Sequence, residues 1–259
     1  MQYMLIHAID ETVDLDERQA ARDQSLLATW LEEVVRRGVD LHGSRLRPTS
    51  DATTVRVRKG ELLVSDGPFA ETKEQVAGYD VVECASAEEA IGWASKHPTA
   101  IIGAIEVRPL CSTPRPAPLP APKEGKMRYV LFVCLGQDFE IGPQDEAEIG
   151  PATGRWAEEM DGRGVRLFGS QLEGVDKART VRLKGEQLLV TDGPFAETKE
   201  QIAGFDILEC NDLDEALEVA AKHPMAKFGM LELRPFWPFA GPQGTKLRAD
   251  GSRAPAQRE

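Results

Sequence analysis

Apolar segments with a preference for β-structure recur along the chain in the same order twice. In the first half they lie at 3–9, 39–46, 54–58, 62–65, 78–84 and 101–107, and in the second at 129–135, 165–172, 180–183, 188–191, 204–210 and 228–233. The first segment of each series is apolar throughout, which is typical of a central strand covered on both faces. The third and fourth segments flank a short Gly-containing turn and predict a β-hairpin.

Helical periodicity follows the first strand of each half. Residues 16–37 carry one apolar stripe and are followed by Gly38, which is placed to end the helix. In the second half Gly150, Pro151 and Gly154 interrupt the pattern. We therefore expect only about 151–161 to be helical there, with Pro151 in the first turn.

A shorter helix is predicted near the end of each half. Ser86 and Asp212 each precede a Glu by three residues, the spacing of a capping box, and the helices should run to 96 and 222. His97 and His223 follow directly, each before a proline. We interpret these histidines as cations favoured by the helix dipole rather than as catalytic groups.

One ten-residue sequence occurs twice without a change. Asp66-Gly-Pro-Phe-Ala-Glu-Thr-Lys-Glu-Gln75 returns as Asp192 to Gln201, and the same shift of 126 positions aligns Trp30 with Trp156. The chain is therefore a duplicated domain. We expect one copy at 1–110, a Pro-rich linker at 111–126, the second copy at 127–236, and a disordered tail at 237–259.

The predicted fold class is α+β. Each unit is interpreted as a ferredoxin-like β-α-β-β-β-α-β arrangement, with helices on one face of a mainly antiparallel sheet. The other sheet face needs a cover. The linker holds five prolines and should reach on the order of 50 Å. The two sheets are therefore expected to pack face to face within one chain, as a pseudo-dimer.

Composition narrows the classes of partner. The 259 residues carry a net charge of -12, which argues against nucleic acid and anionic membranes as partners. No apolar run reaches the roughly 18 residues of a membrane span, and no signal-peptide pattern follows Met1, so a cytoplasmic location is expected. The four cysteines form no CxxC pair and are interpreted as free thiols, mostly buried.

The repeated decapeptide, the Gly-aromatic strand after it, the capped helix and the final Val-Arg-Pro or Leu-Arg-Pro resemble the YCII-related family, in its DGPF subgroup. The resemblance covers about 1–110 and 127–236. It implies a dimeric α+β barrel, formed here within one chain. It also implies a regulatory setting, because some bacterial members are encoded beside extracytoplasmic-function sigma factors.

Other YCII relatives are dehalogenase-like or isomerase-like enzymes that use a His and Asp pair, with the His early on the first helix. No histidine occurs at 15–37 or 145–161 in this chain. The resemblance therefore does not carry that pair over.

The decapeptide offers the first candidate residues. Asp66 and Asp192 end a strand before Gly-Pro, where the carboxylate either caps the loop's own N–H groups or acts as a general base or ligand anchor. Lys73 and Lys199 lie on the same loops and are candidate ligand-binding residues. The phenylalanine of each loop, Phe69 or Phe195, is expected to fill the core or the seam between domains.

The hairpins offer a candidate anion site. Alternation along the strand predicts that Thr54 and Arg56, with Thr180 and Arg182, face the other sheet. The arginines would bind a carboxylate or phosphate there, or pair with glutamates on neighbouring strands.

Two histidines occur only in the first half. His7 and His42 correspond to Val133 and Phe168, so they are either packed core residues or the mark of one active and one structural half. The sequence contains no zinc-ligand spacing, phosphate-binding glycine loop or Gly-x-Ser-x-Gly elbow, and no cofactor is predicted.

These observations leave three functions open. The first is a module that binds a small, anionic molecule between its domains in an accessory or regulatory role. The second is a cofactor-free lyase, isomerase or hydrolase that uses Asp66 or Asp192 with His7 or His42. The third is a protein-interaction scaffold, and further homo-oligomers are compatible with each.

Overall fold

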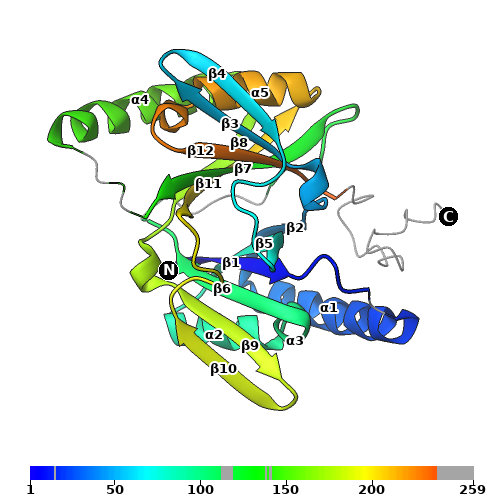
Figure 1. Cartoon of the computed structure of the whole chain (residues 1–259). Coiled ribbons are helices and arrows are strands. Elements are labelled where there is room, and N and C mark those ends of the chain that lie inside the picture. Colours follow the sequence, from blue (N-terminus) through cyan, green and yellow to red (C-terminus); the bar gives the residue numbers. More distant parts are fainter. Residues whose placement is uncertain (15, 112–118, 138, 140–141, 238–259) are drawn as a thin grey trace.

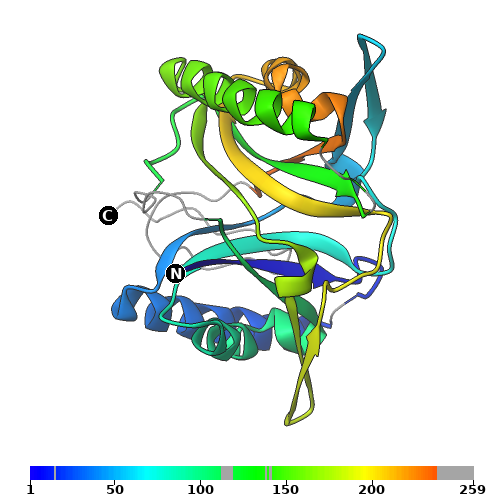
Figure 2. The ribbon, with the colours of Figure 1, turned by 90° about the vertical axis from the view of Figure 1, so that its left-hand side faces the viewer.

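The computed structural model describes residues 1–14, 16–111, 119–137, 139 and 142–237. Two antiparallel six-stranded sheets pack face to face, and the helices cover their outer faces (Figure 1, Figure 2). The first copy supplies β1 Gln2–Ile9, α1 Glu17–Arg37, β2 Asp40–Arg45, β3 Thr53–Arg58, β4 Glu61–Asp66, β5 Gln75–Glu83, α2 Ala87–Lys96, α3 Thr99–Ile102 and β6 Gly103–Pro109. The second supplies β7 Met127–Gly136, α4 Pro143–Gly162, β8 Arg166–Gln171, β9 Arg179–Lys184, β10 Gln187–Asp192, β11 Glu200–Cys210, α5 Leu213–Lys222 and β12 Met230–Pro235. Short 3-10 turns lie at Thr49–Asp51, Val175–Lys177 and Pro224–Lys227.

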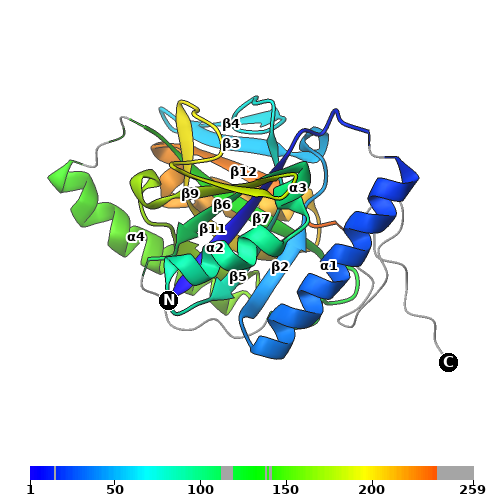
Figure 3. The ribbon, with the colours of Figure 1, turned by 90° about the horizontal axis from the view of Figure 1, so that it is seen from below.

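The predicted fold class is confirmed. Within each sheet, four strands of one copy follow the ferredoxin-like order, β6-β1-β5-β2 in the first sheet and β12-β7-β11-β8 in the second. Each copy has six strands, one more than the β-α-β-β-β-α-β order, because both strands of the hairpin form. Figure 3 shows α1 and α2 lying across the outer face of the first sheet.

The hairpins are exchanged between the copies, which the sequence did not predict. β3 of the first copy pairs with β12 of the second, with Val55 opposite Leu231. In the same way β9 of the second copy pairs with β6 of the first, with Val181 opposite Ile105. Each sheet therefore contains four strands from one copy and two from the other. The two copies are therefore joined by backbone hydrogen bonds as well as by side-chain packing.

Three apolar clusters form the core. Two lie between a sheet and its helices, one around Trp30 and Trp93 and the other around Trp156 and Met160. The third lies between the sheets and contains residues of both copies, among them Tyr79, Phe132 and Phe205. Phe69 and Phe195 pack against this third cluster, which confirms their predicted place at the seam. The seam is thus a filled core.

The first helix agrees with its prediction, and its counterpart does not. The Asp16 carboxylate accepts a hydrogen bond from Gln19 N at 2.8 Å, and Gly38 ends α1 with φ 65°. The prediction that the second helix covers only 151–161 is wrong, since α4 spans Pro143–Gly162 with Pro151 inside it. Trp156 and Met160 are buried against the sheet. This packing outweighs the hydrogen bond that Pro151 cannot make.

The shorter helices begin as predicted. Ser86 Oγ accepts from Glu89 N at 3.3 Å, and Asp212 Oδ1 accepts from Glu215 N at 2.9 Å. All four cysteines are free, and three of them are buried. No helix in the described part of the chain is long and apolar enough to cross a membrane. Residues 112–118 of the predicted linker and the predicted tail from 238 onward lie outside the described residues.

Candidate functional site

The repeated decapeptide is the connection that carries the chain from one sheet to the other. β4 ends at Asp66 in the second sheet, and β5 begins at Gln75 in the first. The loop turns at Gly67, whose φ of 96° is in the left-handed region, and the matching Gly193 has φ 92°. Residues other than glycine rarely adopt this conformation. The glycine of the repeat is therefore required by the turn itself.

The loop is closed by its own polar side chains. Gln75 Nε2 donates to the carbonyl oxygens of Ala70 at 3.3 Å and Thr72 at 2.9 Å, and the Thr72 hydroxyl donates to Glu74 O. Gln201 makes the same two bonds in the second copy, at 3.3 and 3.2 Å. These bonds explain why threonine and glutamine recur at fixed places in both repeats.

Each loop is fastened by a buried Glu and Arg of the other copy. Glu232 pairs with Arg234 on β12, and its Oε2 accepts the N–H of Phe69 at 2.8 Å. Arg234 Nη1 donates to Val76 O at 2.8 Å and to Arg47 O at 3.3 Å. Val76 lies on β5 just after the decapeptide loop, and Arg47 lies between β2 and β3, where the chain also passes from one sheet to the other. We call this arrangement a latch pair.

The second latch pair is Glu106 and Arg108 on β6. Glu106 Oε2 accepts from Phe195 N at 3.1 Å, and Arg108 Nη1 donates to Ile202 O at 3.2 Å and Glu173 O at 3.1 Å. Both latch pairs are at most 2% exposed. The latch therefore repeats bond for bond, with the roles of the two copies reversed.

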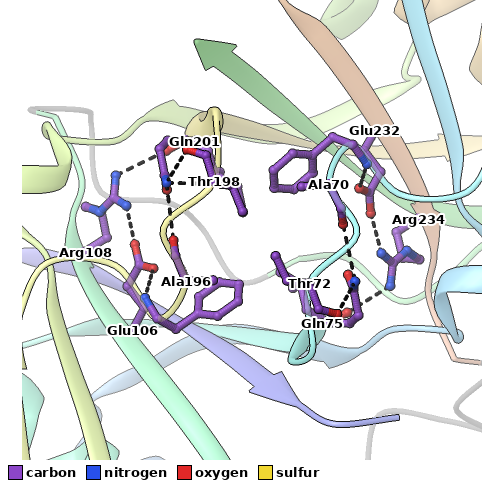
Figure 4. Close-up of a pocket in the computed structure, with 14 residues that line it drawn as sticks. Ala70, Thr72, Gln75, Glu106, Arg108, Ala196, Thr198, Gln201, Glu232 and Arg234 are labelled. Atoms are coloured by element: carbon purple, nitrogen blue, oxygen red, sulfur yellow. Dashed lines mark hydrogen bonds and ion pairs between the residues drawn. The ribbon is translucent and has the colours of Figure 1, made fainter. Parts of the chain in front are cut away.

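The space between the two loops is small. Figure 4 shows the loops facing each other across a pocket, with a latch pair on either side. The cavity volume is about 20 Å³, which is room for one water molecule. Each arginine that lines the cavity is already paired with a glutamate, although Arg108 Nε and Arg234 Nε have no hydrogen-bond partner among the described residues.

A different group of ionisable residues lies under the helices of the first copy. His7 Nε2 on β1 is 3.0 Å from Asp80 Oδ2 on β5, although the two are not aligned as a hydrogen bond. The His97 ring, at the end of α2, packs on the His7 ring with centroids 4.2 Å apart. The ligand atoms of all three residues lie within 4.8 Å of one another. We call these three residues the His7 site.

The second copy fills the same place differently. Val133 replaces His7, and the carboxylate of Asp206 is bound by Arg166, with Nε 2.6 Å from Oδ1. The first copy has Asp40 where the second has Arg166. Asp80 therefore lies beside a histidine of β1, whereas Asp206 is paired with a permanently charged arginine and lies 3.7 Å from His223 Nε2.

Two glycines make room for these carboxylates. A Cβ at Gly43 would overlap the Asp80 carboxylate, and a Cβ at Gly169 would overlap that of Asp206. A close approach of another part of the chain is a common reason for a glycine inside a strand. The group that approaches is an aspartate side chain from the neighbouring strand.

His97 and His223 are neutral parts of the fold. His97 Nδ1 accepts from Thr99 N at 3.1 Å, and His223 Nδ1 accepts from Met225 N at 3.1 Å. Burial lowers the pKa of both imidazoles, so the interpretation of these histidines as cations at a helix end is wrong. A metal-bound histidine normally donates its second N–H. His97 could bind a metal through Nε2 only by giving up its bond to Thr99.

Comparison with known proteins agrees with this architecture. The YCII-related domain family matches the chain twice, at residues 1–113 and 127–240. The chain belongs to the YCII-related family. An uncharacterized protein of Rhizobium meliloti (strain 1021) is 46% identical over 80 residues, which cover 30% of this chain and 64% of that relative. The chain thus spans less than two thirds of the relative's length.

In this YCII-related chain the aspartates of the decapeptide lie on the surface. Asp66 and Asp192 end the edge strands β4 and β10 and are exposed. Asp192 forms an ion pair with Arg179 at 3.1 Å, and no hydrogen bond to the Asp66 carboxylate is present among the described residues. Neither aspartate is brought to a histidine, and a catalytic role for them stays a prediction.

The predicted anion-binding residues are mostly occupied. Thr54 and Thr180 donate to the carbonyls of Gly67 and Gly193, each at 2.8 Å. Arg182 forms a two-pronged ion pair with Glu74, with Nη2 2.6 Å from Oε2, whereas Arg56 is exposed.

The two lysines of the repeats point to the surface. Lys73 Nζ is 3.9 Å from Asp10 Oδ2, and Lys199 lines a shallow surface depression beside Glu197. The structure does not gather the predicted ligand-binding residues into one pocket.

The two first-copy histidines lie on opposite faces of their sheet. His7 faces the helices, while His42 faces the other sheet, where its ring lies 5.0 Å from that of Phe168. Burial lowers the pKa of His42 to about 4. His42 is a packed neutral residue, as one of the alternatives expected.

Sequence reasoning missed Asp80 and the latch pairs. Asp80 stands inside an apolar strand, which was the available signal, because a buried carboxylate needs a partner. The latch residues follow each other at spacing two on β6 and β12, and the family's Arg-Pro ending contains the arginine. Their partners could not be identified, since the bonds join parts of the chain up to 187 residues apart.

Proposed function

We propose that this YCII-related protein has one functional half, in which His7 and Asp80 act as an acid-base pair on a small molecule, and one structural half. The observation that carries the proposal is the 3.0 Å contact between His7 and Asp80, which the second copy replaces with Val133 and an Arg166 ion pair. The second copy folds with an apolar residue and a permanently charged arginine at this place. Folding of the unit therefore does not require the histidine.

The arrangement suits proton transfer. His7 Nε2 is buried and faces Asp80, so Nδ1 is the nitrogen left to exchange a proton with a ligand. In the working cycle Nδ1 accepts a proton from the bound molecule, and Asp80 stabilises the resulting imidazolium. The same proton then returns to the product. This chemistry serves a lyase, an isomerase or a hydrolase and needs no cofactor.

A binding role at the same site is the non-catalytic form of this proposal. The protein would then sense a small molecule in an accessory or regulatory setting. Association with an extracytoplasmic-function sigma factor stays a prediction that rests on the family resemblance. An anionic ligand between the domains stays a prediction too, and it requires the decapeptide loops to open, because the cavity there is about 20 Å³.

Chemical modification tests the site without knowledge of the ligand. Diethyl pyrocarbonate acylates unprotonated imidazoles that solvent can reach, and the chain has only four histidines. Peptide mass spectrometry of the treated full-length protein should place the first modification on His7. All four histidines are buried, with 8% of His7 exposed and 6, 4 and 3% of His42, His97 and His223, so the last three serve as internal references of similar burial. Modification of any of these before His7 would contradict an accessible base at His7.

An interaction scaffold is the second candidate, because the exchanged hairpins end in apolar edge strands. Leu62, Leu63 and Val64 on β4 are 49, 41 and 47% exposed, and Leu188 and Val190 on β10 are 45 and 42% exposed. Exposed edges of this kind pair readily with other strands. Analytical ultracentrifugation of the wild type and of Leu63→Lys tests it, and identical monomeric profiles over a wide concentration range would count against self-association.

A further inference from the structure

The four edge strands of the two sheets differ in how open they are. β2 and β8 each pair with a shift in register, and their residues are mostly buried or half-buried. β4 and β10 pair without a shift, and every residue of β4 and all but one of β10 are exposed. Both carry Leu-Leu-Val at their centre. Because edges are normally protected by bulges or charged side chains, β4 and β10 are open to another strand.

The outward backbone groups of β4 belong to alternate residues. The two residues that flank the hairpin turn exchange hydrogen bonds, so alternation directs the N–H and C=O groups of Leu62 and Val64 away from β3. Val64 lies opposite Val55, which is buried in the cluster around Trp156. Leu62 and Val64 therefore face the helix side of the sheet, and Leu63 faces the other side. Figure 1 shows β4 at the outer edge of the second sheet.

We propose that two molecules of this chain form a dimer in which β4 pairs antiparallel with β4 of the partner subunit, with the two-fold axis at Leu63. The proposal rests on the interaction-scaffold function and is independent of the His7 site. In this register Leu62 lies opposite Val64 of the partner subunit, and the pair exchanges both backbone hydrogen bonds. Leu63 lies opposite Leu63 of the partner subunit on the other face. The apolar side chains that β4 exposes to solvent are thereby covered.

The charges of the hairpin fit a partner of the same sequence. In the register centred on Leu63, Glu61 lies opposite Ser65 of the partner subunit, and Gly60 lies opposite Asp66 of the partner subunit. Lys59 precedes Gly60 and so lies next to the same Asp66, which gives an attractive pair on each side of the axis. Like charges do not face each other anywhere along the paired strands. The β4 sequence is therefore self-complementary in charge as well as in its apolar positions.

The equivalent pairings of β10 are opposed by like charges. The β10 turn has Glu186 at the place of Gly60. Pairing of β10 with itself would set Glu186 opposite Asp192, and pairing of β4 with β10 would set Glu186 opposite Asp66. Like charges directly opposite each other destabilise a strand pair. The preference of β4 for itself closes a two-fold dimer, whereas pairing of β4 with β10 would link molecules into an open chain.

Cysteine cross-linking tests the position of the axis. The Cα atoms of a pair without mutual hydrogen bonds are about 4.5 Å apart, a distance that a disulfide can span. With oxidised glutathione, full-length Leu63→Cys should form a disulfide-linked dimer about tenfold or more faster than Leu189→Cys, the equivalent position of β10. Non-reducing gel electrophoresis measures both rates against the wild type, and labelling with N-ethylmaleimide corrects for different access to the two thiols. Equal corrected rates would refute pairing through β4.

Charge substitutions opposite Glu61 test the register. Ser65→Lys should lower the dissociation constant of the dimer by about threefold, and Ser65→Glu should raise it by about threefold, because each dimer contains the pair twice. Thr191→Lys and Thr191→Glu make the same charge changes on β10 and should have less than about half of these effects. Sedimentation from micromolar to near-millimolar protein measures all four variants and the wild type.

The outcomes separate this dimer from the proposed functions. A wild type that stays monomeric over the whole range would overturn the dimer. Equal effects at 65 and 191 would show diffuse charge attraction and refute pairing through β4, although an interaction surface elsewhere on the molecule would still stand. Acylation of His7 is unaffected by any of these results, since His7 lies on β1 in the other sheet.

Discussion

The latch pair and the His7 site both lie on strands that occur in each copy. The latch pair is the same in the two copies, whereas the His7 site is not. Glu106 with Arg108 and Glu232 with Arg234 make the same bonds to the opposite copy's loop. The His7 site has a counterpart of different chemistry, built on Val133 and Arg166. The difference separates what the fold needs in both copies from what only the first copy contains.

The repeated motif has the same structural tasks in both copies. In both copies the decapeptide loop must turn at its glycine, form hydrogen bonds with its own polar side chains, and bind the latch pair of the other copy. These shared tasks account for the identity of the two repeats. None of these tasks requires its aspartate or its lysine to meet a substrate. Residues that differ between the copies, such as His7 and Val133, lie instead in segments that share only their pattern of apolar positions.

Separating the halves should have the largest effect. A chain of residues 1–113 alone has no β12 to receive its β3–β4 hairpin. It should either unfold or form a homodimer that restores the exchange, and 127–240 should behave in the same way. Size-exclusion chromatography with light scattering and circular dichroism distinguish the states. A folded monomer of either half would refute the dependence of each sheet on the other copy.

Breaking a latch pair should be the next largest effect. Arg108→Met and Arg234→Met each leave a buried glutamate without its partner, and each should lower the free energy of unfolding by about 3–5 kcal/mol. Arg56→Met removes an exposed arginine of the same chain and should cost less than about 0.5 kcal/mol. Urea unfolding measures all three. A large difference between the two latch variants would end the claim that the latch is symmetric.

His42→Phe gives the first copy the residue that the second has at Phe168, and it should reduce the dependence of stability on pH. The folded pKa of His42 is about 4, below the ordinary value of about 6.5. Between these values the unfolded chain binds more protons, so stability is lost as the pH falls. From pH 7 to pH 5 the variant should lose about 1–2 kcal/mol less than the wild type. Parallel urea curves at the two pH values provide the measurement, and equal losses would contradict it.

Asp66→Asn and Asp192→Asn should have the smallest effects. Asp66 is exposed, and the ion pair of Asp192 with Arg179 joins side chains that are 88 and 37% exposed. Each change should alter the free energy of unfolding by less than about 0.5 kcal/mol. Acylation of His7 should be unchanged as well. Slower modification of His7 in either variant would indicate that the decapeptide aspartates belong to the functional site.

The duplication, the α+β class, the helix caps and the family could be predicted from the sequence. Each rests on local information, such as the caps at Ser86 and Asp212, or on the identity of two stretches of the same chain. The course of α4 through Pro151 could not, because the burial of Trp156 and Met160 decides it. The sequence also named His7 as a candidate together with Asp66 or Asp192, whereas the carboxylate that lies beside His7 is that of Asp80.

The sequence by itself determined that two like domains face each other within one chain, and that only the first carries extra histidines. Tertiary structure alone decided that the hairpins exchange, that the latch glutamates hold the opposite loops, and that Asp80 is the carboxylate beside His7. The physical reason is the range of the interactions. Caps, turns and strand periodicity act within a few residues, whereas the contacts of Glu232 with Phe69 and of His7 with Asp80 join positions 163 and 73 residues apart and exist only once the sheets have formed.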